Sequence, residues 1–120
     1  MRNFRNLNIW KDGITLVAEI YQLATLLPDD EKFGLKSQVC RAAVSVPSNI
    51  AEGSSRNSEV EYKRFLEIAM GSLFEVETQL IIIKELSLIS DEKINSILEL
   101  VHKEQKMINN LISKLKASSK

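Results

Sequence analysis

The sequence predicts an all-α fold: an antiparallel up-down-up-down four-helix bundle whose second helix is kinked near Pro47. Apolar residues recur at steps of three and four in four separate stretches, which is the spacing of a helix face. Short polar connections join these stretches, and no segment alternates as a strand would. We expect helices at about 9–27, 34–52, 59–87 and 91–116, in a single domain spanning residues 1–120.

Length and composition limit the classes of function. A chain of 120 residues is long enough for one hydrophobic core. Lys plus Arg and Asp plus Glu both number 16, so the zero net charge argues against whole-surface binding to nucleic acid and leaves only local patches. The single cysteine, Cys40, has no partner for an intrachain disulfide, and no stretch reads as a leader or a membrane span. These features predict a cytoplasmic protein with no membrane partner.

The first helix carries two adjacent apolar rows. One row consists of Ile14, Val17, Ala18, Tyr21 and Ala24, and the bulkier second row of Leu16, Ile20, Leu23 and Leu27. A face this broad predicts contacts beyond one bundle, and therefore self-association. Pro28 and the two aspartates after it are typical of a loop and end this helix.

The second helix contains a proline. Pro47 has no N–H for the carbonyl of Ala43, at a cost of roughly 3 kcal/mol in an isolated helix interior. The apolar pattern nevertheless continues to Ile50, so the sequence favours a kink over a stop. The polar residues Ser48, Asn49 and Glu52 that follow have two interpretations: a ligand contact, or satisfaction of the carbonyls that the proline frees.

The connection to the third helix has recognisable end signals. Gly53 stands where a left-handed residue would follow the last turn of the second helix. Ser58 and Glu61 have the spacing of a capping box, in which the hydroxyl accepts from the third helical N–H and the carboxylate reaches back.

The last two helices each contain one exception to their apolar pattern. Gly71 and Ser72 lie in the middle of the third helix, and we expect another backbone to approach closely there. In the fourth helix, which Ser90 is expected to cap, the apolar stripe is interrupted at Glu104 and Gln105.

No residue set predicts catalysis, a metal site or a bound cofactor. The one histidine, His102, follows Glu99 by three residues, but carboxylate-bridged metal bundles need several such pairs, so a solvated surface pair is the preferred interpretation. Cys40 next to Arg41 is either a thiol of lowered pKa or a small residue at a helix flank, and we prefer the second. The protein is therefore expected not to be an enzyme.

Basic residues around the second helix form the candidate nucleic-acid site. They are Lys36, Arg41, Arg56, Lys63 and Arg64. The free N–H groups at the start of the third helix would also favour an anion. The alternative is that Glu52, Glu59 and Glu61 pair with these cations. A further contrast separates 65–92, with six acidic and one basic residue, from 93–120, with six basic and two acidic residues.

Three stretches carry a resemblance to a known family. They are SQVCRAAVSVPSNIAEGSSR at 37–56, RFLEIAMGSLFEVETQL at 64–80 and NFRNLNIWKDGITLVAEIYQLATLLPDDEKFGLKSQ at 3–38. Together they resemble the bacterial four-helix bundle proteins encoded in intervening sequences of 23S ribosomal RNA genes, also labelled S23 ribosomal proteins. The family usually carries two adjacent basic residues where this chain has Cys40 and Arg41.

The resemblance implies a ring-like homo-oligomer, with a pentamer as the expected form, and an association with nucleic acid. Related bundles serve as accessory factors of diversity-generating retroelements. We therefore expect a non-enzymatic oligomer that contacts RNA or DNA backbones. The alternative is a protein-interaction scaffold that recruits a partner enzyme, such as a polymerase or nuclease, without touching nucleic acid.

Overall fold

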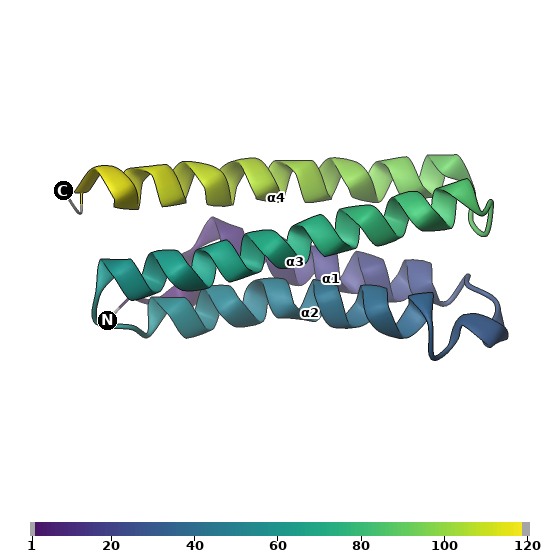
Figure 1. Ribbon diagram of the computed structural model, residues 1–120, viewed down its shortest axis with the longest axis horizontal. Coiled ribbons are helices and arrows are strands. Elements are labelled where there is room, and N and C mark those ends of the chain that lie inside the picture. The colour runs from purple at the N-terminus through teal and green to yellow at the C-terminus, as the bar shows by residue number, and fades with distance from the viewer. Residues whose placement is uncertain (1, 119–120) are drawn as a thin grey trace.

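The computed structural model describes residues 2–118 and confirms a four-helix bundle (Figure 1). Its long helices are α1 (Asn8–Ala24), α2 (Leu35–Ser54), α3 (Glu59–Glu85) and α4 (Asp91–Ser118). Two 3-10 turns, η1 (Phe4–Asn6) and η2 (Asp29–Glu31), precede α1 and α2. The first helix ends at Ala24, earlier than expected, because Thr25 and Leu26 continue as a turn. The molecule measures 47 × 20 × 20 Å.

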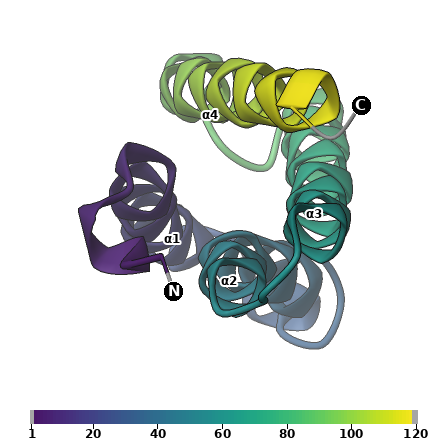
Figure 2. The same ribbon diagram turned by 90° about the vertical axis from the view of Figure 1, so that its left-hand side faces the viewer.

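The helices form a ring around one core. Viewed from the end, α2 lies between α1 and α3, and α4 closes the ring against α3 and α1 (Figure 2). The core is built from the apolar residues that recur at helical spacing, including Ile20, Val46, Leu73, Ile94 and Ile108. Among residues 2–118, no helix is both long and apolar enough to cross a membrane.

The two apolar rows of α1 have different surroundings. The bulkier row, Leu16, Ile20, Leu23 and Leu27, is buried in the core. In the other row Ala24 is buried, whereas Ile14 and Tyr21 remain 45% and 50% exposed. The bulkier row therefore fills the core of the bundle, and most of the other row faces outward.

The helix α2 continues through Pro47, as the apolar pattern predicted. Pro47 is buried, and the amide of Asn49 donates to the carbonyl oxygen of Ser45 at 2.8 Å and to its hydroxyl at 2.9 Å. Asn49 thus has a structural role, although its partner is Ser45 and not the freed carbonyl of Ala43. Ser48 is exposed.

The predicted left-handed conformation of Gly53 is wrong. It does not adopt a left-handed conformation after the helix; it lies inside α2, is buried, and no glycine among residues 2–118 has a positive φ. A Cβ at Gly53 would lie 2.7 Å from the Cβ of Phe65 and 3.2 Å from the Tyr62 ring. The glycine is required because the start of α3 packs directly against it.

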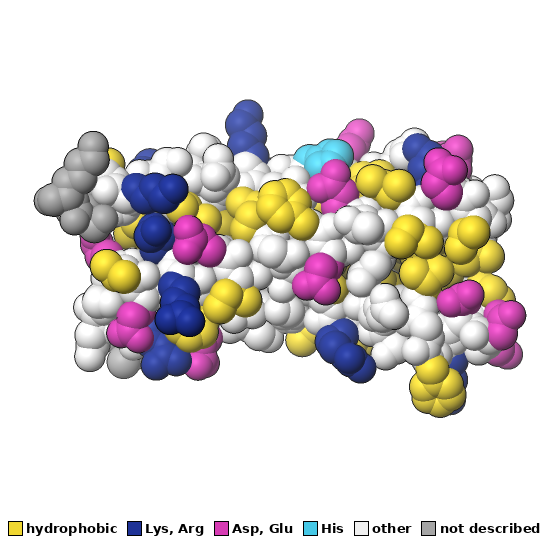
Figure 3. Space-filling view, viewed as in Figure 1, with side chains coloured by type: hydrophobic (Ala, Val, Ile, Leu, Met, Phe, Trp, Pro, Cys, Tyr) yellow, Lys and Arg dark blue, Asp and Glu magenta, His cyan; other side chains and the backbone are white. Residues whose placement is uncertain are grey.

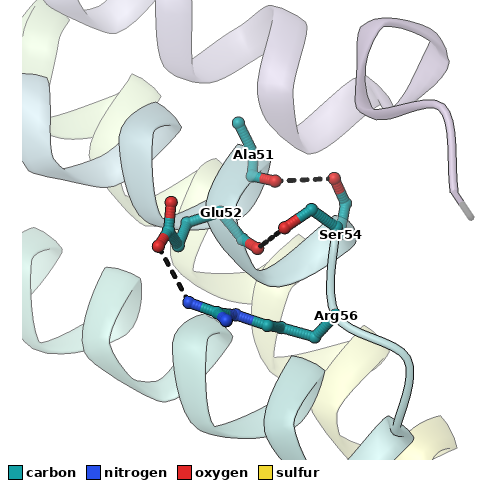
Figure 4. A network of polar contacts seen from close by, with 5 residues as sticks. Ala51, Glu52, Ser54 and Arg56 are labelled. Atoms are coloured by element: carbon teal, nitrogen blue, oxygen red, sulfur yellow. Dashed lines mark hydrogen bonds and ion pairs between the residues drawn. The ribbon is translucent and has the colours of Figure 1, made fainter.

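Hydroxyl groups, in place of a left-handed residue, end α2. Ser54 Oγ donates to the carbonyl of Ala51 at 2.8 Å, and Ser55 Oγ donates to that of Glu52 at 2.7 Å (Figure 4). These bonds satisfy carbonyls that lack helical partners. Ser58 then caps α3 as predicted, accepting from the N–H of Glu61 at 3.1 Å. The reciprocal bond from the Glu61 carboxylate is not formed within the described chain.

The predicted close approach of another backbone at Gly71 is also wrong. Nothing lies within 4 Å of the position that a Cβ of Gly71 would occupy, apart from its own helix, so no other backbone approaches it. The close contact occurs one residue later, where the buried Ser72 donates its hydroxyl to Ser45 Oγ of α2 at 2.8 Å. The prediction of a close backbone approach was wrong for Gly71, and at Ser72 the contact with α2 is made by side-chain hydroxyls.

The two glycines give a matched test of this packing. Alanine in place of a helical glycine gains about 1 kcal/mol of helix propensity. At Gly71 the added methyl group meets open space, so Gly71→Ala should raise the free energy of unfolding by about 0.5–1 kcal/mol. Gly53→Ala should lower it by about 1–2 kcal/mol, since the overpacking cost of roughly 1–3 kcal/mol exceeds the gain. Urea unfolding measures both; equal effects would contradict the contact at Gly53.

Candidate nucleic-acid interface

The structure separates the predicted basic residues. Arg56, Lys63 and Arg64 lie together where α2 ends and α3 begins. Lys36 lies in the first turn of α2, about 30 Å from Arg56 at 1.5 Å per residue. Arg41 is exposed between them. The five residues therefore do not form one site.

The antiparallel arrangement adds other cations to the first group. The end of α4 lies beside the start of α3, and the N-terminal segment lies against the turn between α2 and α3 (Figures 1 and 2). We call this region the basic end; it consists of Arg2, Arg5, Arg56, Lys63, Arg64, Lys114 and Lys116. Figure 3 shows Lys and Arg side chains gathered there, with acidic side chains among them.

Aromatic rings and a backbone bond hold part of the basic end in place. Arg2 donates from Nη1 to the carbonyl oxygen of Arg56 at 3.0 Å, and its guanidinium lies 4.2 Å from the centre of the Tyr62 ring. The guanidinium of Arg56 lies 4.8 Å from the centre of the Phe65 ring. Cation–π contacts of this kind orient a guanidinium while leaving donors available.

Two of the predicted cations also have acidic partners. Arg56 Nη2 is 2.9 Å from Glu52 Oε1, and the pair is visible in Figure 4. Lys63 Nζ is 3.6 Å from Glu67 Oε2. The alternative of salt-bridged structure therefore applies to these two residues, with Glu52 and Glu67 as partners; Glu61 does not take part in these pairs.

The opposite end of the bundle is acidic. It carries the carboxylates of η2, the end of α3 and the start of α4: Asp29, Asp30, Glu31, Glu85, Asp91 and Glu92. Lys36 lies at this end, which makes it unsuited to a site shared with Arg56. Lys32, Lys84 and Lys93 lie at this end as well, so its six carboxylates stand with four lysines and its excess of negative charge is small.

Neither the histidine nor the cysteine forms a reactive set. His102 Nε2 lies 3.4 Å from Glu77 Oε2 of α3, and not beside Glu99. Gln105 donates to Glu77 at 2.8 Å, and this bond is the main reason that the pKa of Glu77 is lowered. Burial raises the pKa of the Cys40 thiol, against the alternative of an activated thiolate. Within residues 2–118, no three His, Cys, Asp or Glu side chains are placed to hold a metal ion.

Glu104 is the residue that the sequence interpretation missed. It does not interrupt the apolar face of α4 but belongs to it, and it is only 1% exposed. Its carboxyl group lies where α1, α2 and α4 meet. A Cβ added to Gly13 of α1 would lie 3.2 Å from Glu104 Oε2 and 3.3 Å from the Cβ of Pro47 in α2. The spacing Val101, Glu104, Ile108 at steps of three and four was the available signal.

The surroundings of Glu104 favour its neutral form. Neither carboxyl oxygen has a hydrogen-bond partner within the described residues. Burial, and to a smaller extent the neighbouring Asp12, raise the pKa of Glu104 to about 8 against the lowering effect of Lys103. Lys103 and Asp12 themselves pair at 3.6 Å nearer the surface.

The fold and the charged surface define an all-α four-helix bundle protein with a polar candidate interface. A family model for the 23S rRNA-intervening sequence protein matches residues 5–110, and the chain belongs to this family. A solved structure from Bacteroides thetaiotaomicron, described as a protein of unknown function from the S23 ribosomal protein family, has the same fold. It is 23% identical, with a TM-score of 0.81 over 87% of this chain and 97% of the other. No curated protein matches the chain.

The buried carboxyl group makes stability depend on pH. In the unfolded chain Glu104 loses its proton near its ordinary pKa of 4.5, whereas the folded chain retains the proton to about pH 8. Stability should therefore fall as the pH rises from about 4.5 to 8. Glu104→Gln removes the ionisation, so it should stabilise the fold by roughly 3–5 kcal/mol at pH 8.5 and by much less at pH 4.

Urea unfolding of both proteins across this pH range measures the effect. Glu99→Gln, an exposed change on the same helix, is the control and should not alter the pH profile. Parallel profiles for the parent and Glu104→Gln would show that Glu104 is ionised in the folded state.

Proposed function

We propose that this chain is a non-enzymatic, oligomeric protein that binds the phosphate backbone of RNA or DNA through its basic end. The observation that carries the proposal is the gathering of cations from the N-terminal segment, the α2–α3 turn, α3 and α4 at one end of the bundle. The name of the family connects its members with 23S ribosomal RNA genes, which makes RNA the first ligand to test.

The existing ion pairs leave room for phosphate. Arg56–Glu52 and Lys63–Glu67 are exposed i,i+4 pairs, which contribute only about 0.3–0.5 kcal/mol each. A phosphate oxygen offers a charge-assisted hydrogen bond of greater strength to the same donors. Arg64 and Lys114 are exposed and form no ion pair within the described chain. The basic end can therefore accept an anion without unfolding any element.

Self-association would strengthen such binding. The outward row of α1 offers Ile14 and Tyr21 as apolar contacts for a second copy. An oligomer presents several basic ends to one polyanion, so modest single contacts add up through avidity. A pentameric ring remains the expected form.

The scaffold alternative has its own supporting observation. Exposed apolar side chains lie along α3: Ile68, Phe74, Ile81 and Ile82. A hollow of about 700 Å³ between α3 and α4 lies beside the open position at Gly71. A partner protein could pack on this face without any contact to nucleic acid.

Charge reversal at the basic end tests the primary proposal. Arg64→Glu with Lys114→Glu should weaken binding to a structured RNA fragment at least tenfold and flatten its salt dependence, because phosphate contacts are lost. Lys32→Glu with Lys93→Glu makes the same charge change at the acidic end and should have a much smaller effect. Fluorescence anisotropy across a salt series measures both.

Two results would contradict the proposal. Equal losses in the two double variants would mean that net charge, and not the basic end, controls binding. No binding by the parent protein at low salt would favour the scaffold alternative, and stoichiometric recovery of a protein partner without nucleic acid would support it.

The outward row of α1 gives a separate prediction. Tyr21→Lys should shift the protein from an oligomer to a monomer in light-scattering mass measurements, since it places a charge in an apolar contact. Val60→Lys, at another exposed apolar position, in the first turn of α3, should leave the mass unchanged. An unchanged mass for Tyr21→Lys would place any interface elsewhere.

A further inference from the structure

The outward face of α3 is apolar although nothing in the described chain covers it. Ile68, Phe74, Ile81 and Ile82 are each at least 40% exposed. The opposite face of the same helix supplies core residues such as Leu73. Hydrophobic side chains are visible along this side of the molecule in Figure 3. A helix that is apolar on both faces is normally covered on both, so the outward face of α3 has the character of a contact surface.

The α3–α4 hollow contains a glycine that has no packing role in its own bundle. Met70, Gly71 and Phe74 of α3 line this hollow of about 700 Å³ together with residues of α4 such as Ile112. Nothing beyond its own helix lies within 4 Å of the position that a Cβ of Gly71 would occupy. A glycine here costs about 1 kcal/mol of helix propensity relative to alanine. Its missing side chain would let another helix approach at the short end of the usual separation of about 8–10 Å.

The outward row of α1 has the shape of a stripe that could fill this hollow. Lys11, Ile14, Ala18 and Tyr21 recur at steps of three and four, and all four are exposed. Such a stripe lies along one face of a helix. Lys11 forms no ion pair within the described chain. The stripe therefore combines apolar side chains with one unpaired cation.

The charges of the two faces are complementary. The outward face of α3 carries the exposed carboxylates Glu67, Glu75 and Glu85, with Arg64 as its cation. Two α3 faces in contact would bring carboxylates together, and two α1 stripes would bring two copies of Lys11 together. A contact of α1 with α3 pairs opposite charges instead.

The two faces point away from each other in one molecule. The helices α1 and α3 lie diagonally in the ring of helices, and no Cα atom of one lies within 8 Å of a Cα atom of the other (Figure 2). One copy can therefore offer α1 to one neighbour and α3 to another. Such a head-to-tail contact, when repeated, closes a ring or continues as a filament.

Contacts through α2 show which residues of α1 and α3 lie at one height along the bundle. A Cβ on Gly13 of α1 would lie 3.3 Å from the Cβ of Pro47 in α2. Two residues earlier in α2, Ser45 accepts a hydrogen bond from Ser72 of α3. Two residues of helix rise about 3 Å, and α1 and α3 run in the same direction. The residue after Gly13 and the residue before Ser72 therefore lie at the same height.

These two residues are Ile14 and Gly71. We infer that the outward row of α1 in one copy of this chain packs into the α3–α4 hollow of a second copy, with Ile14 against Gly71 and Lys11 near Glu67. Two copies side by side, without a shift along their axes, bring these pairs together. Glu67 lines the hollow, and its exposed pair with Lys63, at 3.6 Å, is a weak competitor. The inference rests on the oligomeric part of the proposed function and names the surface that receives α1.

Cross-linking tests the contact and its direction. In a Cys40→Ser background, one protein carries Ile14→Cys and a second carries Gly71→Cys. A disulfide requires Cα atoms within about 7 Å, which α1 and α3 of one chain do not reach. The co-expressed pair, treated with a mild oxidant, should give at least about fivefold more disulfide-linked dimer on a non-reducing gel than either protein alone.

A charge exchange tests the same contact without cysteines. Lys11→Glu, and separately Glu67→Lys, should raise the protein concentration needed for assembly about tenfold, because each brings like charges together. The double variant Lys11→Glu with Glu67→Lys should regain the parent's assembly. Lys11→Glu with Glu85→Lys, which changes a carboxylate near the far end of α3, should not regain it. Light-scattering mass over a dilution series measures assembly, and circular dichroism confirms folding.

The outcomes separate this contact from the proposed function. Equal cross-linking by either protein alone would show a contact between identical faces and overturn the inference. An oligomer that neither cross-links nor responds to the charge exchange would also overturn it, while self-association and RNA binding stand. A parent that is monomeric at every concentration would overturn self-association as well, and RNA binding is measured independently by anisotropy. Loss of a different bound protein in Gly71→Leu, with the oligomer intact, would assign the hollow to that protein instead.

Discussion

The close approach of α2 and α3 is the constraint on which the rest of this structure depends. Gly53 has no side chain, so Phe65 and Tyr62 pack directly against the last turn of α2. Farther along the same interface, the buried hydroxyls of Ser45 and Ser72 meet. This contact fixes where α3 begins, and with it the positions of the cations in the connecting turn. The basic end is therefore a consequence of this helix pair.

Much of this architecture was predictable because local chemistry specifies it. The four apolar stripes and the Ser58 cap depend on neighbours within a few residues, and the structure bears them out, although the first helix ends at Ala24 and not at Leu27. The roles of Gly53 and Gly71 could not be predicted from their positions in the sequence. A glycine is found both where the backbone needs an unusual conformation and where a neighbour packs too closely for a side chain. Gly53 provides space, and Gly71 merely faces outward. Lys36 was wrongly grouped with Arg56. The two residues lie at opposite ends of α2, nearly the whole length of the helix apart.

Zero net charge proved a poor guide to the surface. The sequence already showed acidic and basic stretches, but only antiparallel packing decides which of them become neighbours. It places the lysines at the end of α4 beside the start of α3, while η2 and the start of α4 lie at the opposite end of the bundle without contacting each other. The result is an excess of cations at one end of the bundle, where Glu52, Glu59, Glu61 and Glu67 lie among them, and a smaller excess of carboxylates at the other. Salt screens the interactions of such exposed charges beyond about 10 Å at 0.1 M.

Glu104 and Gln79 illustrate two different reasons for a polar side chain in a core. Gln79 borders shallow depressions between α2 and α3, but its Oε1 is itself buried and accepts no hydrogen bond within the described chain. Glu104 packs against Pro47 and the Cβ-free surface of Gly13, which fit the carboxyl group without providing a hydrogen bond. Protonation lowers the free-energy cost of burying the Glu104 carboxyl group, because the neutral acid loses far less hydration than the carboxylate. The bundle therefore tolerates Glu104 as a neutral group, and the loss of that proton should lower the free energy of unfolding.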